Sequence, residues 1–435
     1  MHLLSTSGKS PAVSFRQAVM AGIAPDGGLY LPAAIPGLDP ATIEGFRNLS
    51  FQEIGITVAR KLLDGEIPDG DLSVIVRNAL SFPVPLHCVD DDTAVLELFH
   101  GPTLAFKDFG ARFMAQVLSY FRGKESQEWT ILVATSGDTG SAVAQGFLGA
   151  EGIRVVLLYP SGRVSTTQEL QLTTIGGNVT ALEIDGTFDD CQRLVKSAFA
   201  DHELSARCRL TSANSINIAR LVPQSFYYFE AYARRPDMRR PVVFSVPSGN
   251  LGNLTGGILA WKMGLPVARF IAATNVNRAF TDYVETGAFT PRQALPTISN
   301  AMDVGNPSNL ARIAEIFAGS MEALKAILDS TSVTDDATRE TIRRVAGRTG
   351  YVLDPHGAVA YAALQRWRAG HASGALGVVL ETAHPAKFLD AYDDVLKRSI
   401  AVPERLAAVL KKKKRSVKLS SAFKDLQSYL LEEVS

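Results

Sequence analysis

The stretch WTILVATSGDTGSAVAQGF, residues 129–147, decides the fold of this 435-residue chain. It consists of a fully apolar run, then a loop of glycine and hydroxyl residues, then a segment with helical spacing of its apolar residues. The same unit recurs at residues 153–170, 178–199, 242–261, 268–280 and 374–392. Apolar strands that alternate with helices are typical of parallel sheets with helices on both faces. The sequence therefore predicts the α/β class, with doubly wound, mostly parallel sheets.

The polar segment EAYARRPDMRRP, residues 230–241, separates two groups of these units, so we expect two sheets. In doubly wound sheets, ligands bind at the carboxyl ends of the strands. We therefore expect the cofactor cleft between the two sheets, where the polar loops gather. The predicted division is a mixed, largely helical N-terminal region (1–95), two α/β domains (96–235 and 236–402) and a helical C-terminal tail (403–435).

Charge and composition argue against several classes of partner. Lysine plus arginine equals aspartate plus glutamate at 44 each, so no net field attracts nucleic acid or a membrane surface. The chain has no apolar run of the roughly 18 to 20 residues that span a bilayer. Its start, MHLLSTSGKS, lacks a basic segment followed by an apolar core, so we expect a cytoplasmic protein. Three widely spaced cysteines and seven scattered histidines predict neither disulfides nor a metal site.

One lysine, Lys107, lies between two phenylalanines in HGPTLAFKDFGARF, residues 100–113. A lysine at its ordinary pKa is protonated at neutral pH and is neither a nucleophile nor a base. One interpretation is that its alkyl stem packs on the apolar neighbours while the ammonium stays in water. The other is a desolvated amine or a Schiff-base lysine. This stretch alone leaves both open.

Two loops have the composition of anion sites. PSGNLGNLTGG, residues 247–257, follows a strand and opens a helix, where free N–H groups and glycines can hold a phosphate. TSGDTGSA, residues 135–142, has the same placement and adds the hydroxyl groups of Thr135, Ser136 and Thr139. The plainer interpretations are a glycine-rich helix start and an ordinary N-cap. A dinucleotide G-x-G-x-x-G motif is absent. An imine-forming lysine with a phosphate loop on a doubly wound sheet points to pyridoxal phosphate.

The chain resembles the threonine synthases, in the branch shared by enteric bacteria and yeast, over nearly its whole length. The stretches that carry the resemblance are HGPTLAFKDFGARF, TSGDTGSA, NSINIAR (214–220), VPSGNLGN, MDVGNPSN (302–309), ETAHPAKF (381–388) and the N-terminal SFRQAVMAGIAPDGGLYLP. The resemblance implies a fold type II, pyridoxal-phosphate-dependent lyase. It implies conversion of O-phospho-L-homoserine and water into L-threonine and phosphate, the last step of threonine biosynthesis, by a monomer or homodimer.

The resemblance also assigns roles to single residues. Lys107 matches the Schiff-base lysine, which once released serves as base at successive substrate carbons. Thr382 matches the residue that faces the pyridine nitrogen, and its hydroxyl leaves the ring a milder electron sink than a carboxylate would. The loop for the cofactor phosphate comprises Gly249, Asn250, Leu251, Gly252 and Asn253. Leu251 replaces a frequent phenylalanine, but only its backbone N–H is expected to matter.

Asp138 stands where many relatives place an asparagine near the phenolic oxygen of the cofactor. Two anions in a dry pocket repel, so Asp138 must share a proton, pair with a cation or point away. The residues expected to receive the carboxylate or phosphate of the substrate are Ser136, Gly137, Thr139, Gly140, Ser215, Asn217, Arg220, Asn306, Ser308 and Asn309. For Arg220, a structural salt bridge is the alternative.

Two alternative functions stay open at this point. One is another β-eliminating or β-replacing enzyme of the same fold, such as a serine or threonine dehydratase or a relative of cysteine synthase. The other is a catalytically silent homologue that binds a phosphorylated ligand.

Overall fold

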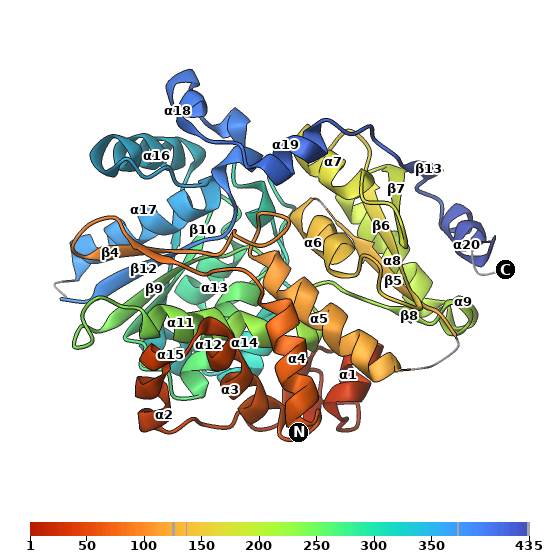
Figure 1. Ribbon diagram of the computed structural model, residues 1–435, viewed down its shortest axis with the longest axis horizontal. Coiled ribbons are helices and arrows are strands. Elements are labelled where there is room, and N and C mark those ends of the chain that lie inside the picture. The colour runs from red at the N-terminus through yellow and green to blue at the C-terminus, as the bar shows by residue number, and fades with distance from the viewer. Residues whose placement is uncertain (124–126, 136, 372–373, 433–435) are drawn as a thin grey trace.

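The structure is a computed structural model that describes residues 1–123, 127–135, 137–371 and 374–432 (Figure 1). The larger sheet has six strands, in which only the edge pair β3·β4 is antiparallel. Its strands, in spatial order, are β11 (Leu328–Ser332), β10 (Arg269–Thr274), β9 (Val242–Pro247), β12 (Leu376–Glu381), β4 (Thr93–Glu97) and β3 (Leu86–Cys88).

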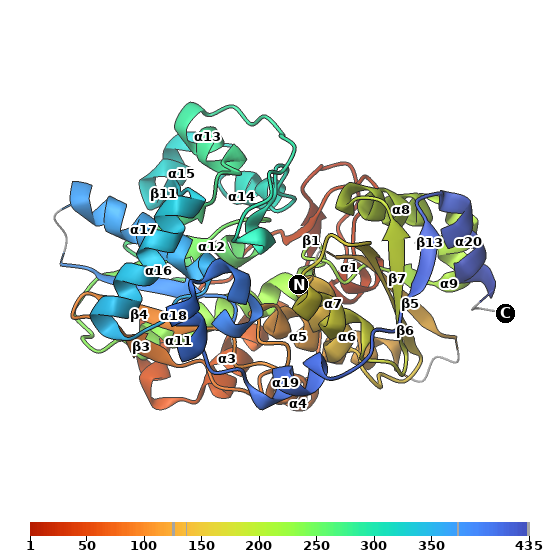
Figure 2. The ribbon, with the colours of Figure 1, turned by 90° about the horizontal axis from the view of Figure 1, so that it is seen from above.

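The smaller sheet has five strands, all parallel to their neighbours. In spatial order they are β13 (Val417–Ser420), β7 (Val179–Asp185), β6 (Ile153–Pro160), β5 (Trp129–Ala134) and β8 (Leu210–Thr211). A separate antiparallel pair joins β1 (Leu3–Ser5) to β2 (Tyr30–Pro32). In Figures 1 and 2, the larger sheet lies on the left and the smaller on the right, with helix α5 between them.

Helices cover both faces of both sheets, as the apolar strands predict. Those of the N-terminal half are α1 (Phe15–Ala21), α2 (Pro40–Gly45), α3 (Phe51–Leu63), α4 (Asp69–Ala79), α5 (Lys107–Arg122), α6 (Asp138–Gly146), α7 (Thr166–Thr173), α8 (Phe188–Ala200), α9 (His202–Cys208), α10 (Ile218–Leu221) and α11 (Phe226–Ala233). Those that follow are α12 (Gly252–Lys262), α13 (Ala279–Thr286), α14 (Leu310–Ile316), α15 (Met321–Ile327), α16 (Asp335–Thr349), α17 (Pro355–Gly370), α18 (Asp394–Ser399), α19 (Glu404–Leu410) and α20 (Phe423–Glu432). Short 3-10 turns are η1 (Phe46–Asn48), η2 (Val222–Ser225), η3 (Asn300–Met302), η4 (Pro385–Lys387) and η5 (Leu389–Ala391).

Successive residues of one strand enter different hydrophobic cores, which shows that the sheets are covered on both sides. In β12, Val378 and Leu380 belong to the central core that α3, α5 and α11 share, whereas Val379 packs against α16 and α17. In β5, Val133 faces the central core and Leu132 faces the core under α8 and α20. The predicted α/β class with doubly wound, mostly parallel sheets is confirmed.

The ends of the chain complete both sheets. Strands β3 and β4 join the larger sheet from residues near the predicted limit at 95. The C-terminal tail is helical in α19 and α20, but it also contains β13, which pairs with β7 at the edge of the smaller sheet (Figure 2). The predicted division at residues 95, 235 and 402 stays a prediction.

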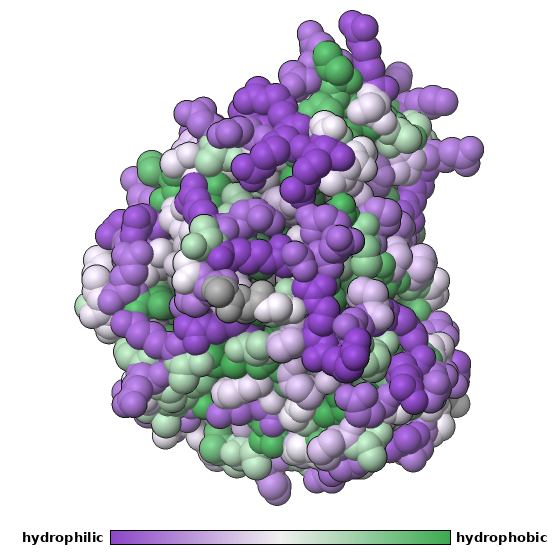
Figure 3. Space-filling model, turned by 90° about the vertical axis from the view of Figure 1, so that its left-hand side faces the viewer, coloured by the Kyte–Doolittle hydropathy of each residue, from purple (hydrophilic) through white to green (hydrophobic). Residues whose placement is uncertain are grey.

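The surface on the larger sheet's side is mostly hydrophilic, with apolar side chains in small groups (Figure 3). Within the described ranges, we find no helix long and apolar enough to cross a membrane.

Candidate active site

A cavity of about 330 Å³ opens where the strands of both sheets end. Its lining includes Thr135 after β5, Pro247 at the end of β9 and Thr382 after β12. The position agrees with the expected cleft at the carboxyl ends of the strands. Of the residues predicted from the sequence, the lining contains Lys107, Thr139, Ser215, Arg220, Gly249, Asn250, Leu251, Gly252, Asn253, Asn306, Ser308 and Thr382.

Two motifs more than 270 residues apart lie side by side at this cavity. Ala105 and Ala383 form an antiparallel bridge, the N–H of Phe106 donates to the carbonyl of Thr382 at 2.8 Å, and the N–H of His384 donates to the carbonyl of Leu104 at 3.0 Å. This pairing fixes the start of α5, whose first residue is Lys107. The main chain therefore holds Lys107 and Thr382 next to each other.

The amine of Lys107 has an unusual electrostatic setting. Desolvation lowers the pKa of Lys107 to about 8, and the positive charges of Lys387 and Arg220 act in the same direction, while Asp138 opposes them. A pKa near 8 leaves a substantial unprotonated fraction at neutral pH. Of the two interpretations of Lys107, the structure favours the desolvated amine.

Asp138 forms a buried ion pair. Its Oδ1 accepts from Lys387 Nζ at 2.6 Å and from Gln168 Nε2 at 3.1 Å, and Lys387 Nζ also donates to the carbonyl of Thr103 at 3.1 Å. Burial opposes ionisation, but Lys387 and then Lys107 hold the pKa of Asp138 well below its usual range. Of the three alternatives for Asp138, the structure has the pairing with a cation. We call Lys107, Asp138 and Lys387 the charged cluster.

On the other side of the cavity, neutral groups hold the loop after β9. Asn250 donates from Nδ2 to Ser215 Oγ and accepts at Oδ1 from the N–H of Ser308, both at 2.6 Å. Asn309 Nδ2 donates to the carbonyl of Asn250 at 2.9 Å. We call these four residues the amide cluster. They fix the loop that leads into α12.

The loop itself has the shape of an anion cradle. Leu251 adopts the left-handed conformation, with φ of 61°, immediately before α12 begins at Gly252. The first N–H groups of a helix lack partners within the helix and attract anions. Gly249 lets two loops meet, since a Cβ there would lie 2.8 Å from the Cα of Met302. Asn253 Oδ1 accepts from two buried tyrosines, whereas its Nδ2 has no hydrogen-bond partner in the described part of the chain.

Arg220 lies against the cavity with unused hydrogen-bonding capacity. Its Nη1 donates to the carbonyl of Ala213 at 2.5 Å, but its buried Nε has no partner among the residues that the structure describes. Burial lowers the pKa of Arg220 to about 10. Gly110 permits this placement, because a Cβ at residue 110 would lie 2.8 Å from Arg220 Nε. Between the two alternatives for Arg220, the unpartnered Nε favours an anionic ligand.

Some predicted site residues do not reach the cavity lining. Asn217 is fully buried, and its side chain caps α10 and donates to the carbonyls of Val19 and Ser212. The N–H groups of Gly137 and Gly140 donate to Thr135 Oγ1 at 3.0 and 2.8 Å, so this hydroxyl takes the donors expected for a substrate anion. Asp138 is also outside the lining, as is its partner Lys387. Ser136 lies outside the described residues.

One part of the cavity was not predicted from the sequence. His356 Nδ1 contacts Asp354 Oδ1, and the N–H of Ala301 donates to His356 Nε2 at 3.3 Å. Asp354 in turn accepts at Oδ2 from the N–H of Ala383 at 3.2 Å, next to Thr382. The pair thus joins the end of β12 to the loop at 300–309. The available sequence signal was Asp354-Pro355, a helix N-cap followed by proline at N1.

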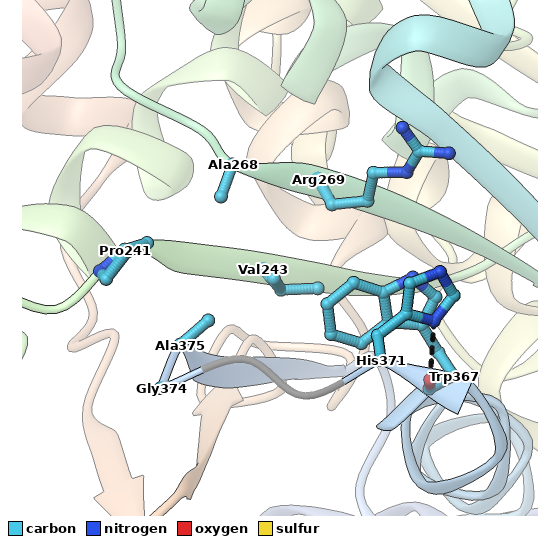
Figure 4. Close-up of a pocket in the computed structure, with 8 residues that line it drawn as sticks. All are labelled: Pro241, Val243, Ala268, Arg269, Trp367, His371, Gly374 and Ala375. Carbon is cyan, nitrogen blue, oxygen red and sulfur yellow. Dashed lines mark hydrogen bonds between the residues drawn. The ribbon is translucent and has the colours of Figure 1, made fainter. Parts of the chain in front are cut away.

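A second hollow lies at the opposite end of the larger sheet (Figure 4). It is lined by Pro241, Val243, Ala268, Arg269, Trp367, His371, Gly374 and Ala375. Strands β9 and β10 begin here, so the hollow is at their amino ends. The rings of Trp367 and His371 stack with centroids 4.6 Å apart, and Arg269 is engaged by Asp329 at 2.7 Å. We do not place the active site there, because ligands of such sheets bind at the carboxyl ends.

Comparison with protein families and solved structures supports the motif-based resemblance. A family model described as pyridoxal-phosphate dependent enzyme matches residues 92–381. Models for the threonine synthase N terminus and the threonine synthase C-terminal region match residues 2–80 and 357–430.

Individual relatives are similar over essentially the full chain. Threonine synthase of Serratia marcescens is 44% identical over 432 residues, 99% of this chain and 99% of that protein. The crystal structure of threonine synthase from Escherichia coli has a TM-score of 0.92 and 43% identity and covers 100% of both chains. The structure of threonine synthase with bound pyridoxal phosphate from Brucella melitensis has a TM-score of 0.91 and 36% identity, with 100% of this chain and 99% of that one covered.

Proposed function

Because this chain belongs to the threonine synthase family of pyridoxal-phosphate-dependent enzymes, we propose that it converts O-phospho-L-homoserine and water into L-threonine and phosphate. This reaction is the last step of threonine biosynthesis. The observation that carries the proposal is a desolvated lysine in the same cavity as an N–H cradle for phosphate.

The residues present fit the cofactor. Lys107 would hold its aldehyde carbon, the N–H groups of residues 249–253 its phosphate, and the Thr382 hydroxyl its ring nitrogen. The unpartnered Nδ2 of Asn253 and the start of α12 at Gly252 agree with a loop that binds an anion. When bound, pyridoxal phosphate supplies an electron sink for negative charge that develops at the substrate carbons.

Lys107 supplies the proton transfers. With a pKa near 8, its amine can take a proton from the substrate Cα at neutral pH and return it later. The overall chemistry breaks the bond between Cγ and the phosphate oxygen and adds water at Cβ, so a single amine must serve successive carbons. The main-chain pairing with residues 382–384 fixes the backbone of Lys107 at the start of α5.

The second phosphate and the carboxylate of the substrate need further donors. Arg220 offers its free Nε, and Ser215, Asn306 and Ser308 lie on the same lining. Thr139 follows Asp138 at the start of α6 and also lines the cavity. It is the predicted substrate contact on the side of the charged cluster. We assign Arg220 to a substrate anion because a guanidinium can bind such a group through two parallel hydrogen bonds.

Phosphate release from O-phospho-L-homoserine tests the proposal. The purified protein, loaded with pyridoxal phosphate, should release phosphate and L-threonine in equal amounts, and much faster than it deaminates L-serine. Faster deamination of serine would instead identify a dehydratase of the same fold. Binding of the substrate without turnover would identify a silent homologue.

We further propose that the protein works in the cytoplasm as a monomer or homodimer, without nucleic acid. The balanced count of 44 basic and 44 acidic residues supports the absence of a nucleic-acid partner. Sedimentation of the purified protein with and without RNA measures both its mass and any such association.

A further inference from the structure

Lys387 is a second buried lysine beside the cavity, and the proposed reaction leaves it without a role. Its side chain is fully buried, and its ammonium contacts Asp138 and the carbonyl of Thr103. Lys387 lies in the same motif as Thr382, and this motif pairs with residues 104–106. Lys387 and Asp138 therefore occupy fixed positions close to the start of α5.

The surroundings of the pair are built to hold two charges. Gln168 donates to Asp138, and Gln171 donates to the carbonyl of Thr103 at 3.2 Å, so α7 supplies neutral donors on the outer side. Thr103 also donates from N and Oγ1 to Asp108 at 2.9 and 2.8 Å. A buried charge is costly unless it is paired and hydrogen-bonded. Both charges of the pair are satisfied in this way.

We propose that Lys387 is a positioning residue for the proton on the Lys107 nitrogen: it binds Asp138 and so prevents that carboxylate from holding the proton on Lys107. This inference rests on the proposed attachment of the cofactor to Lys107, not on the identity of the substrate. Without Lys387, Asp138 would be an unpaired carboxylate whose charge acts on Lys107. The reactive nitrogen would then keep its proton to higher pH.

Two other charged groups lie near the pair, and one of them, Asp108, has a pKa that Lys387 also lowers. Arg220 adds positive charge near Lys107, and Asp108 lies on the far side of Thr103. Desolvation raises the pKa of Asp108 to about 6, so Asp108 titrates below the range of Lys107. The proposal predicts that substitutions of Lys387 and of Asp138 shift the titration midpoint of the Lys107 nitrogen in opposite directions.

The test is a pH titration of the visible absorbance of the full-length holoenzyme, which reports the proton on the lysine nitrogen joined to the cofactor. Lys387→Met should raise the midpoint by about one pH unit or more, because Asp138 is left unpaired. Asp138→Asn should lower the midpoint, because only the cations remain. The double variant should lie between the two, and Lys387→Arg, which keeps the charge, should stay close to the unsubstituted protein.

A purely structural pair would give a different pattern. Shifts of the same sign in both single variants, or no shift in either, would overturn the inference. If Lys387→Met does not fold, Lys387→Gln, which also removes the charge, is compared with Lys387→Arg: only the glutamine variant should raise the midpoint. A protein that shows no visible band with pyridoxal phosphate would instead contradict the proposed function.

Discussion

The charged cluster and the amide cluster lie at the same cavity, although Lys107 is the one member of the charged cluster in its lining, and the two clusters are held by different interactions. Asp138 and Lys387 are buried ionisable groups and Lys107 is half-buried, whereas the amide cluster around Asn250 holds its loop through neutral hydrogen bonds. Charges in a dry site interact strongly, while a neutral hydrogen bond contributes a net of only about 1 kcal/mol. The difference separates two tasks: one side controls a proton, and the other side holds an anion.

The largest effect should come from Lys107 in the charged cluster. Lys107→Ala should lower phosphate release by at least about 10⁴-fold, because both the attachment point and the acid–base group are lost. Steady-state phosphate assays measure this loss. The exposed Lys424→Ala is the control and should keep full activity. Substantial turnover by Lys107→Ala would remove the proton-transfer task from the charged cluster.

Breaking the Asp138–Lys387 pair should cost stability as well. Lys387→Met should reduce the free energy of unfolding by about 3–5 kcal/mol, since it leaves a buried carboxylate without its cation. Asp138 has a lowered pKa in the folded state, so its contribution is present above the unfolded pKa and is lost as pH falls through the acidic range. Urea unfolding from pH 7 down to about pH 2, which extends below the unfolded aspartate pKa of about 3.9, measures the effect. Asp138→Asn combined with Lys387→Met should recover part of the loss.

The amide cluster should give a smaller and different effect. Asn250→Ala removes two hydrogen bonds, to Ser215 and to the N–H of Ser308, and should weaken binding of pyridoxal phosphate by roughly 10- to 30-fold. Equilibrium titration of the cofactor into the stripped full chain measures this change. The midpoint of the visible absorbance should not move. Ser308→Ala keeps its backbone N–H and is the matched control; an equal loss in that variant would argue against the role of Asn250.

Substitution of Glu381 should have the smallest effect, although this acidic residue is next to Thr382 in the chain. Burial and then Asp354 raise the pKa of Glu381 well above its usual range, so folding favours the protonated carboxyl. Glu381→Gln keeps a neutral side chain of similar size, so it should change the free energy of unfolding by only about 1 kcal/mol at pH 7. A folded pKa above the unfolded one means that stability falls as pH rises, and the glutamine variant should lose less. Denaturation at neutral and alkaline pH checks both statements; a large loss at pH 7 would mean that a carboxylate is needed there.

Local patterns predicted the sheets and most of the cavity. Continuous apolar strands such as residues 129–134 place side chains in two cores, and the loops after them lie at the carboxyl ends. Residues 249–253 were predicted in this way, whereas Lys107 was noted for its position between two phenylalanines and received its role from the family resemblance. Strand β13 was not, because its four residues are partly exposed and pair with a strand more than 230 residues earlier.

Long-range partners explain what the sequence left open. Lys387 and Asp138 are 249 residues apart, so no local spacing connects them, and the pairing of Asp138 could only be given as one of three alternatives. The sequence predicts that the N–H groups of Gly137 and Gly140 are free to bind a ligand, but both donate to Thr135 Oγ1. Asn217 has a side chain that could bind a ligand, but its Nδ2 donates to the carbonyls of Val19 and Ser212 instead.

The most direct test determines which of the two lysines near the cavity, Lys107 or Lys387, holds the cofactor. Borohydride reduction of the protein with bound pyridoxal phosphate, followed by peptide mapping, locates the amine that holds the cofactor. The cofactor should be fixed on Lys107 alone, with Lys387 unmodified. Fixation on Lys387, or on a lysine remote from the cavity, would contradict the assignment of the reactive amine.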